Sequence, residues 1–169
     1  MEKPNLEKYL KAIVAHCPPL ATVLDYDDNT TLNEVLMWAE SVAPYVDTVI
    51  IIPKVSMTID SIPMVIGGKP VRLGYSIPTK HGATDVPIWE FRQREVHLLG
   101  GSPVHQLTVA RYLNVKSADG NYMQKIARWG RFFVGRQMNY DTLSRTKKVD
   151  EDVPYIAFEQ SVKNFVKAW

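Results

Sequence analysis

The chain has 169 residues, a length that fits one domain with a buried core of its own. Hydrophobic residues make up 46% of the chain and charged residues 22%, which is the composition of an ordinary globular protein. The 20 basic and 18 acidic residues give a formal net charge of +2, which neither requires nor excludes a nucleic-acid partner.

Cys17 is the single cysteine, which excludes an intramolecular disulfide and a zinc knuckle. The first residues lack the apolar core of a signal peptide, and no segment has the roughly 18 to 20 apolar residues that span a bilayer. We therefore expect a cytoplasmic protein with no membrane partner, no bound metal and no cofactor.

Helices and strands alternate along the first half of the chain. An apolar stripe predicts a helix over residues 5–15, and Pro18 and Pro19 end it. Thr31 and Glu34 have the spacing of a capping box and predict the start of a helix that runs to residue 42. The run 48–52 is rich in β-branched residues, as in a strand buried on both faces. Further predicted elements are strands at 21–26 and 71–75, a short helix at 55–64 and a turn at 66–70.

The second half continues the alternation. A long polar connection, 76–85, precedes a short helix or extended piece at 86–91. We then expect strands at 95–99 and 115–117, helices at 103–112 and 121–133, a basic linker at 135–153 and a C-terminal helix at 154–169. Four aromatic residues are expected in the core rather than as platforms for stacking bases: Trp89, Trp129, Phe132 and Phe133.

This order of elements predicts an α/β fold with a mainly parallel sheet and flanking helices, in a single domain over residues 1–169. The five strands are too few for a complete eight-stranded barrel, which needs about 250 residues. Two architectures remain. One is a small open sheet, and the other, which we favour, is a partial TIM-barrel-like sheet whose edges are covered by helices or by another subunit.

The most informative segment runs from residue 96 to residue 121. In parallel α/β folds, ligands bind at the carboxyl ends of strands. Gly100, Gly101 and Ser102 form a turn there that either lets a ligand, favourably an anion, approach the backbone or merely joins strand to helix. Asp119 follows the next strand, where a carboxylate is either a nucleophile or general base or the cap of the following helix. Asn121 is a candidate ligand contact beside it.

Other polar residues follow the earlier strands. Asp25 is a candidate proton-transfer residue, although with Asp27 and Asp28 it forms either a simple turn or a Mg²⁺ site. His81 and Lys80 lie in the long connection and are candidates for catalysis and substrate binding, respectively. His97 falls inside an apolar strand, where we expect a structural, hydrogen-bonded histidine.

Residues 97–133 resemble the C-terminal part of the tRNA-guanine transglycosylase superfamily, which includes phage and bacterial enzymes that insert deazaguanines into DNA. Residues 97–103 are similar to the family's strand motif R-Y-L-M-G-V-G-x-P, and residues 127–133 match its ending A-R-x-G-x-x-F. Asp119 falls at the position of the family's nucleophilic aspartate. The chain departs from the family in lacking the Pro-Thr-Arg after that aspartate, the Cys-x-Cys zinc site and the Asp-Ser-Gly-Gly-Phe-Gln segment.

The resemblance implies a transglycosylase-like protein, a reduced phage-type relative, that acts on or binds a nucleobase or nucleoside. In the enzymatic version Asp119 attacks the anomeric carbon, Gly100 and Gly101 offer N–H groups to the ligand, and Asp25 or His81 moves the proton. The alternative is a non-catalytic phage-type binding protein that sequesters a nucleotide or blocks a host factor.

Two further partners are expected. A basic group offers contacts to a nucleic acid, although such residues are more often a solvated face: Arg128, Arg131, Arg136, Lys147 and Lys148. The C-terminal helix at 154–169 carries more apolar side chains than a solvent-facing tail tolerates, and an open sheet leaves edges to cover. We therefore expect a homodimer to which this helix contributes.

Overall fold

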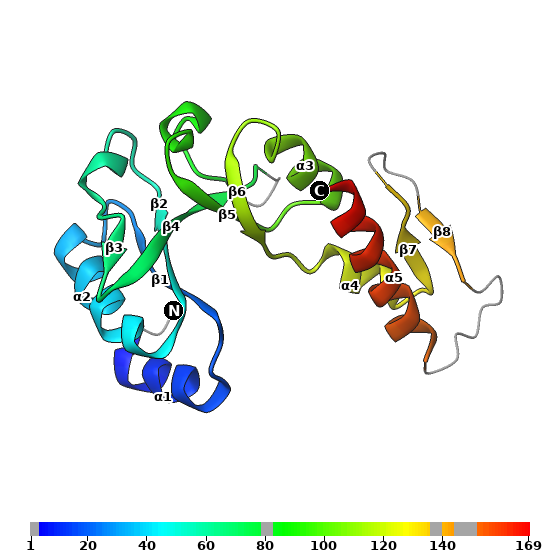
Figure 1. Cartoon of the computed structure of the whole chain (residues 1–169), viewed down its shortest axis with the longest axis horizontal. Coiled ribbons are helices and arrows are strands. Elements are labelled where there is room, and N and C mark those ends of the chain that lie inside the picture. The colour runs from blue at the N-terminus through cyan, green and yellow to red at the C-terminus, as the bar shows by residue number, and fades with distance from the viewer. Residues whose placement is uncertain (1–3, 79–82, 136–139, 144–151) are drawn as a thin grey trace.

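The computed structural model describes residues 4–78, 83–135, 140–143 and 152–169 (Figure 1). Helices, short 3₁₀ turns (η) and strands follow one another along an elongated molecule. In chain order they are α1 (Leu6–His16), β1 (Leu20–Tyr26), α2 (Leu32–Val42), η1 (Ala43–Tyr45), β2 (Thr48–Pro53), η2 (Ile59–Ser61), β3 (Val65–Ile66), β4 (Lys69–Ser76), η3 (Ile88–Phe91), β5 (Glu95–Leu99), α3 (Pro103–Val109), β6 (Asn114–Ala118), α4 (Tyr122–Ala127), β7 (Arg131–Phe133), β8 (Tyr140–Thr142) and α5 (Val153–Ala168).

The main sheet confirms the predicted α/β fold. Five parallel strands are paired in the order β1-β2-β4-β5-β6, and β3 pairs antiparallel with the start of β4. The parallel strands thus stand side by side in the order of the sequence, as neighbouring strands do in an α/β barrel. Within the described residues β1 pairs only with β2 and β6 only with β5, so the sheet is open. All five carboxyl ends lie along one edge.

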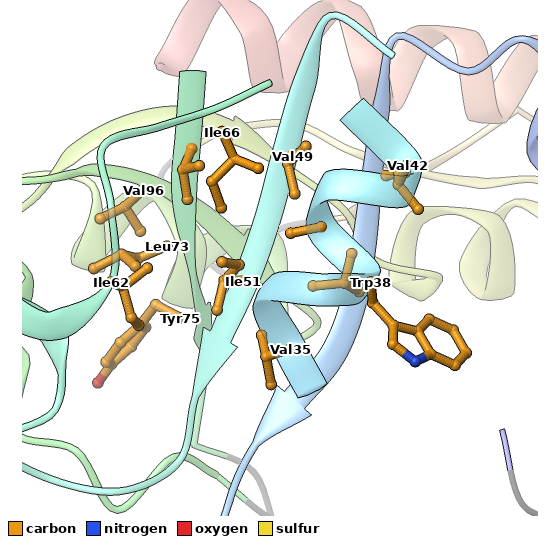
Figure 2. Close-up of a cluster of buried hydrophobic side chains, with 14 of the residues drawn as sticks. Val35, Trp38, Val42, Val49, Ile51, Ile62, Ile66, Leu73, Tyr75 and Val96 are labelled. Atoms are coloured by element: carbon orange, nitrogen blue, oxygen red, sulfur yellow. The ribbon is translucent and has the colours of Figure 1, made fainter. Parts of the chain in front are cut away.

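One face of this sheet carries the main hydrophobic core (Figure 2). Helix α2 starts at the predicted capping box, in which the Thr31 side chain accepts from the Glu34 N–H and the Glu34 carboxylate accepts from the Thr31 N–H. Helix α2 packs chiefly against β1 and β2. The core cluster includes buried residues of α2 and of strands β2, β4 and β5, which are labelled in Figure 2: Val35, Trp38, Val42, Val49, Ile51, Leu73 and Val96. The Trp38 ring points away from these strand residues and lies against the Tyr9 ring of α1.

The opposite face of the sheet is formed by the alternate residues of the same strands. At its centre Gly74 leaves no room for a side chain, because a Cβ there would lie 2.6 Å from Ile52 Cγ1 and 2.9 Å from Leu99 Cδ1. Toward β6 this face turns polar, with Arg72 on β4 and His97 on β5. The candidate site lies next to these polar residues.

The C-terminal part of the chain has a small core of its own. Phe133 of β7, Phe165 of α5 and Leu107 of α3 are buried against one another. The Ser161 hydroxyl of α5 accepts a hydrogen bond from the Phe133 N–H at 3.0 Å, and Figure 1 shows α5 lying along α4 and β7. Because the chain has two separate hydrophobic cores, the structure does not test whether residues 1–169 form a single domain, and this stays a prediction.

Several predicted boundaries are wrong, and glycine explains two of them. The predicted helix 121–133 stops after Ala127, because Gly130 has φ +64° and the chain turns there into β7, which pairs with β8 inside the predicted linker. The predicted turn at 66–70 is present but shorter, because Gly67 and Gly68 both have positive φ and join β3 to β4 in a tight hairpin, so that β4 already begins at Lys69. The predicted helix at 55–64 is only the short turn η2, and the one at 103–112 ends at Val109.

Candidate functional site

A cavity of about 610 Å³ opens beside the carboxyl ends of β5 and β6. We call it the β6 pocket. One wall is made by the turns that follow β5 and β6 and by the first turn of α4, and the other wall by α5. Its lining residues are Gly101, Pro103, Gln106, Lys116, Ser117, Ala118, Asp119, Gly120, Tyr122, Met123, Phe158, Val162, Phe165, Val166 and Trp169.

The α5 wall is apolar. Its five lining residues recur at helical spacing, so they form one stripe along the helix. Several of these side chains are open to solvent, with 66% of Val166 and 45% of Trp169 exposed. Phe165 is buried in the small C-terminal core, but the exposed part of the stripe is available to a ligand or a partner.

The turn after β5 brings the backbone close to this pocket. Gly100 and Gly101 have φ values of +69° and +75°, a conformation that side-chain-bearing residues rarely adopt. A Cβ at Gly101 would also lie 2.8 Å from Ile77 Cγ2, so the close packing of the turn requires glycine there. The Ser102 side chain then caps α3 by accepting from the His105 N–H.

Asp119 is the charged residue at the centre of the site. Its Oδ1 accepts a hydrogen bond from the Gly100 N–H at 3.0 Å, and its Oδ2 lies 3.6 Å from His97 Nε2. The side chain is 57% exposed and lines the pocket. The His97 ring and the Gly100 N–H hold the pKa of this carboxyl below its ordinary value, against the opposing effect of partial burial. Asp119 therefore presents a negative charge to the pocket at neutral pH.

A chain of partly buried polar contacts supports Asp119 from the side of the sheet. His97 is buried, and its Nδ1 lies 2.8 Å from the Ser117 hydroxyl oxygen. Arg72 donates to the same hydroxyl oxygen from Nη1 at 3.2 Å and to Glu95 Oε2 from Nε at 3.2 Å. The expectation of a buried, hydrogen-bonded His97 is confirmed, and the structure adds its contact with Asp119.

Gln106 ties the two turns of the site together. This residue of α3 is buried, and its Nε2 donates to the carbonyl oxygens of both Gly100 and Asp119. Sequence reasoning missed it, because the pairing joins three segments and no local pattern marks it. The available signal was a large polar residue on the apolar side of a short helix next to the Gly-Gly turn.

The structure does not bring Asp25 to this site. Asp25 lies on β1, at the opposite edge of the sheet from β6, and four strand spacings separate them by about 19 Å. Its Oδ2 lies 3.9 Å from Lys54 Nζ, which donates to the Ser76 hydroxyl at 2.7 Å. Burial raises the pKa of Asp25, with the Lys54 charge opposing that shift. This cluster occupies the other half of the carboxyl edge.

The remaining predicted residues fall in three groups. Ser102 and Asn121 lie in the turns that bound the pocket, but neither lines it, and the Asn121 side chain makes no capping bond to α4. Lys80 and His81 lie outside the described residues. Two residues of the predicted basic group are exposed, Arg128 after α4 and Arg131 in β7. The other three lie outside the described residues: Arg136, Lys147 and Lys148.

The turn after β5 holds a carboxylate rather than offering a free anion site. The Gly100 N–H is already donated to Asp119, and α3 is only seven residues long. The second alternative for Asp25, Asp27 and Asp28 was a Mg²⁺ site or a simple turn. Asp27 Oδ1 accepts a hydrogen bond from the Asn29 N–H at 2.8 Å, as in a simple turn. No group of three or more potential metal ligands occurs within the residues that the structure describes.

Comparison with known proteins places the chain in a family without assigning an activity. None of the helices in the described part of the chain is long and apolar enough to cross a membrane. No curated protein and no solved structure matches the chain, so the resemblance to the transglycosylases stays a prediction. The chain belongs, over residues 1–169, to the family of unknown function DUF6610.

Proposed function

We propose that the protein binds a nucleobase or nucleoside in the β6 pocket and that Asp119 recognises it. The observation that carries the proposal is a carboxylate with a lowered pKa at the edge of an otherwise mainly apolar and aromatic cavity. Ligand pockets of about 300 to 1,000 Å³ commonly combine an apolar lining with a few placed polar groups, and the β6 pocket has this composition.

The chemistry of the two walls suits a flat heterocycle. The face of a base packs well against the aromatic rings of Phe158 on α5 and of Trp169 at the end of this helix. The edge of a base carries N–H donors, which the Asp119 carboxylate accepts because it is ionised and has free lone pairs. Lys116, an exposed cation in the lining, lies in position for a phosphate or ribose oxygen of a larger ligand.

A transglycosylase-type reaction is the second candidate function. It is favoured by the place of Asp119 after the last parallel strand, where the carboxylate is ionised as a nucleophile must be. Asp119 attacks the anomeric carbon, the bond to the base breaks, and the departing base takes a proton. Asp25 is too far away to supply it, and His81, the other predicted proton donor, lies outside the described residues. Asp119 is the one carboxylate among the described residues of the pocket lining. Binding without turnover is therefore the better supported function.

The test is a calorimetric titration with guanine, 7-deazaguanines, nucleosides and nucleotides. We expect saturable binding of at least one of them, weakened about tenfold or more by Asp119→Asn, because hydrogen bonds to charged groups are worth about 1.5 to 3 kcal/mol. Glu159→Gln is the matched control, since this exposed acid lies on α5 outside the lining. No saturable binding by any compound, or equal binding by Asp119→Asn, overturns the proposal.

A second measurement separates the two candidates. Incubation of the protein with an oligonucleotide and a radiolabelled base detects exchange into the polymer. Tight binding without exchange assigns a binding protein. Exchange that Asp119→Asn abolishes assigns the transglycosylase reaction instead.

A further inference from the structure

A second hollow lies away from the β6 pocket and shares no lining residue with it. It has a volume of about 450 Å³ and is formed by the connection after β2 and the connection before β5. We call it the Trp89 pocket and define it by its lining residues, Ser56, Met57, Ile59, Asp60, Pro87, Trp89 and Glu90.

Hydrogen bonds between distant segments fix the walls of this pocket. The Glu90 carboxylate accepts from the Met57 N–H at 2.8 Å and from the Ser56 hydroxyl, so it fastens one connection to the other. Beneath them the guanidinium of the buried Arg94 donates to three backbone carbonyls at 2.9 to 3.1 Å, those of Ile59, Ile62 and Pro63. The pocket is thus a built feature of the fold.

The pocket displays large apolar side chains to solvent. Trp89 is 64% exposed, contrary to the expectation that it lies in the core, and Met57 is 92% exposed. Met57 also has φ +62°, a left-handed conformation that is strained for a residue with a side chain. Buried Ile59 also lines the pocket. Neither Met57 nor Trp89 is stabilised by burial in the core of this chain, although both line the same pocket. This exposed apolar surface points to contact with another molecule.

The charged groups of the lining identify the chemistry of that contact. Both of them, Asp60 and Glu90, are acidic. The buried Arg94 interacts electrostatically with Asp60, but its N–H groups are donated to backbone carbonyls, so the Asp60 carboxylate keeps its hydrogen-bond acceptors for a second cation. A tryptophan face attracts a cation, a carboxylate pairs with it, and a methionine packs adaptably on its aliphatic stem. Arginine satisfies all three, because its guanidinium is planar, stacks on aromatic rings and remains charged.

We propose that the Trp89 pocket is a docking site for a basic side chain, arginine above all, presented by a segment of a partner protein. The side chain lies with its stem on Met57 and its guanidinium on the Trp89 ring, and Asp60 accepts its hydrogen bonds. Glu90 holds the pocket together and adds negative charge. This inference does not depend on what the β6 pocket binds.

The probe is N-acetyl-arginine amide, titrated into the full-length ¹⁵N-labelled protein and followed by NMR. We expect a saturable shift of the Trp89 indole N–H, assigned with a Trp89→Phe variant, and of the backbone amides of residues 56–60. The lysine analogue gives a smaller shift, and the neutral probe N-acetyl-norleucine amide, which has an aliphatic side chain without a charged group, gives none. Asp60→Asn weakens arginine binding about threefold, as expected for an exposed ion pair.

Glu40→Gln is the matched control, because it removes an exposed acid on α2 that lies outside the pocket lining. It leaves the arginine titration unchanged. Three results overturn the proposal: no saturable shift at residues 56–60 and 89, equal shifts with the norleucine and arginine probes, or an Asp60→Asn variant that binds arginine as the wild type does. Unchanged amide spectra outside the pocket show that the Asp60→Asn variant is folded.

Discussion

Gln106 offers the sharpest test of how the candidate site is held together. The substitution Gln106→Met keeps the length and approximate volume of the side chain and removes only its polar end. The two hydrogen bonds from Nε2 to the Gly100 and Asp119 carbonyls are then lost.

The magnitude follows from the two bonds. A neutral hydrogen bond contributes about 0.5 to 1.5 kcal/mol, so the loss of both destabilises the protein by about 1 to 3 kcal/mol. This loss of stability is smaller than the cost of leaving two carbonyl groups without any hydrogen bond. The turns of Gly100 and Asp119 are partly exposed, so water can bind to both carbonyl oxygens. For a chain of this size each kcal/mol lowers the melting temperature by about 2 to 4 °C.

The assay is urea unfolding followed by circular dichroism, with melting curves as a second measure. Gln124→Met is the matched control, since it makes the same chemical change at an exposed position of α4. We expect that control to stay within about 0.5 kcal/mol of the wild type, as surface substitutions do. If Gln106→Met also stays within that range with an unchanged m value, the proposed role of Gln106 is wrong.

Three further predictions follow from the described contacts. Because the folded-state pKa of Asp119 is lowered, this group stabilises the fold above its ordinary pKa of about 4, and the contribution is lost as the pH falls through the lower folded value. Urea unfolding between about pH 5 and pH 2 therefore shows a smaller acid loss for Asp119→Asn than for the wild type. Ser161→Ala leaves the buried Phe133 N–H without its acceptor and lowers the free energy of unfolding by about 1 to 3 kcal/mol, measured in urea at pH 7. Light scattering at tens of micromolar gives a dimer mass for the wild type and a monomer mass for Ile156→Glu, which changes an exposed apolar residue of α5; a monomeric wild type refutes the predicted homodimer.

The order of the elements was predictable because it rests on local patterns. The capping box of Thr31 and Glu34 and the β-branched run of β2 each involve residues that are close together in the sequence. The structure confirms both. The pairing of the Gly100 turn with Asp119 was also within reach. The two turns follow strands that are neighbours in sequence, and sequential strands are usually neighbours in a parallel sheet.

Residues that meet only through the tertiary fold could not be placed. Asp25 and Asp119 both follow strands and both carry carboxylates, so the sequence pattern treats them alike. Their separation depends on β1 and β6 being the two edges of the sheet, which is a property of the whole strand order. The contact of Arg72 with Ser117 is likewise a cross-strand pair over β5, whose register no local signal sets.

The aromatic residues show a second limit of pattern reading. Hydrophobicity alone favours burial, and it placed Phe133 correctly. It misplaced Trp89 and Trp129, which are 64% and 73% exposed. Gly130, with its positive φ, turns the chain directly after Trp129, so the ring stands at a helix end rather than inside a continuous helix. The burial of Trp129 therefore depends on where the chain turns, and the hydrophobicity of the residue does not predict that position.

The open edge of the sheet explains why the candidate site has two unlike walls. In a closed barrel another strand would stand beside β6, but within the described residues β6 pairs only with β5. The chain instead turns away into α4 and returns as α5, whose apolar stripe comes to face the carboxyl end of β6. Strand ends therefore supply Asp119 and its polar supports, while the helix supplies an apolar surface. The combination of charge and apolar area that makes the β6 pocket suitable for a ligand arises because the sheet does not close.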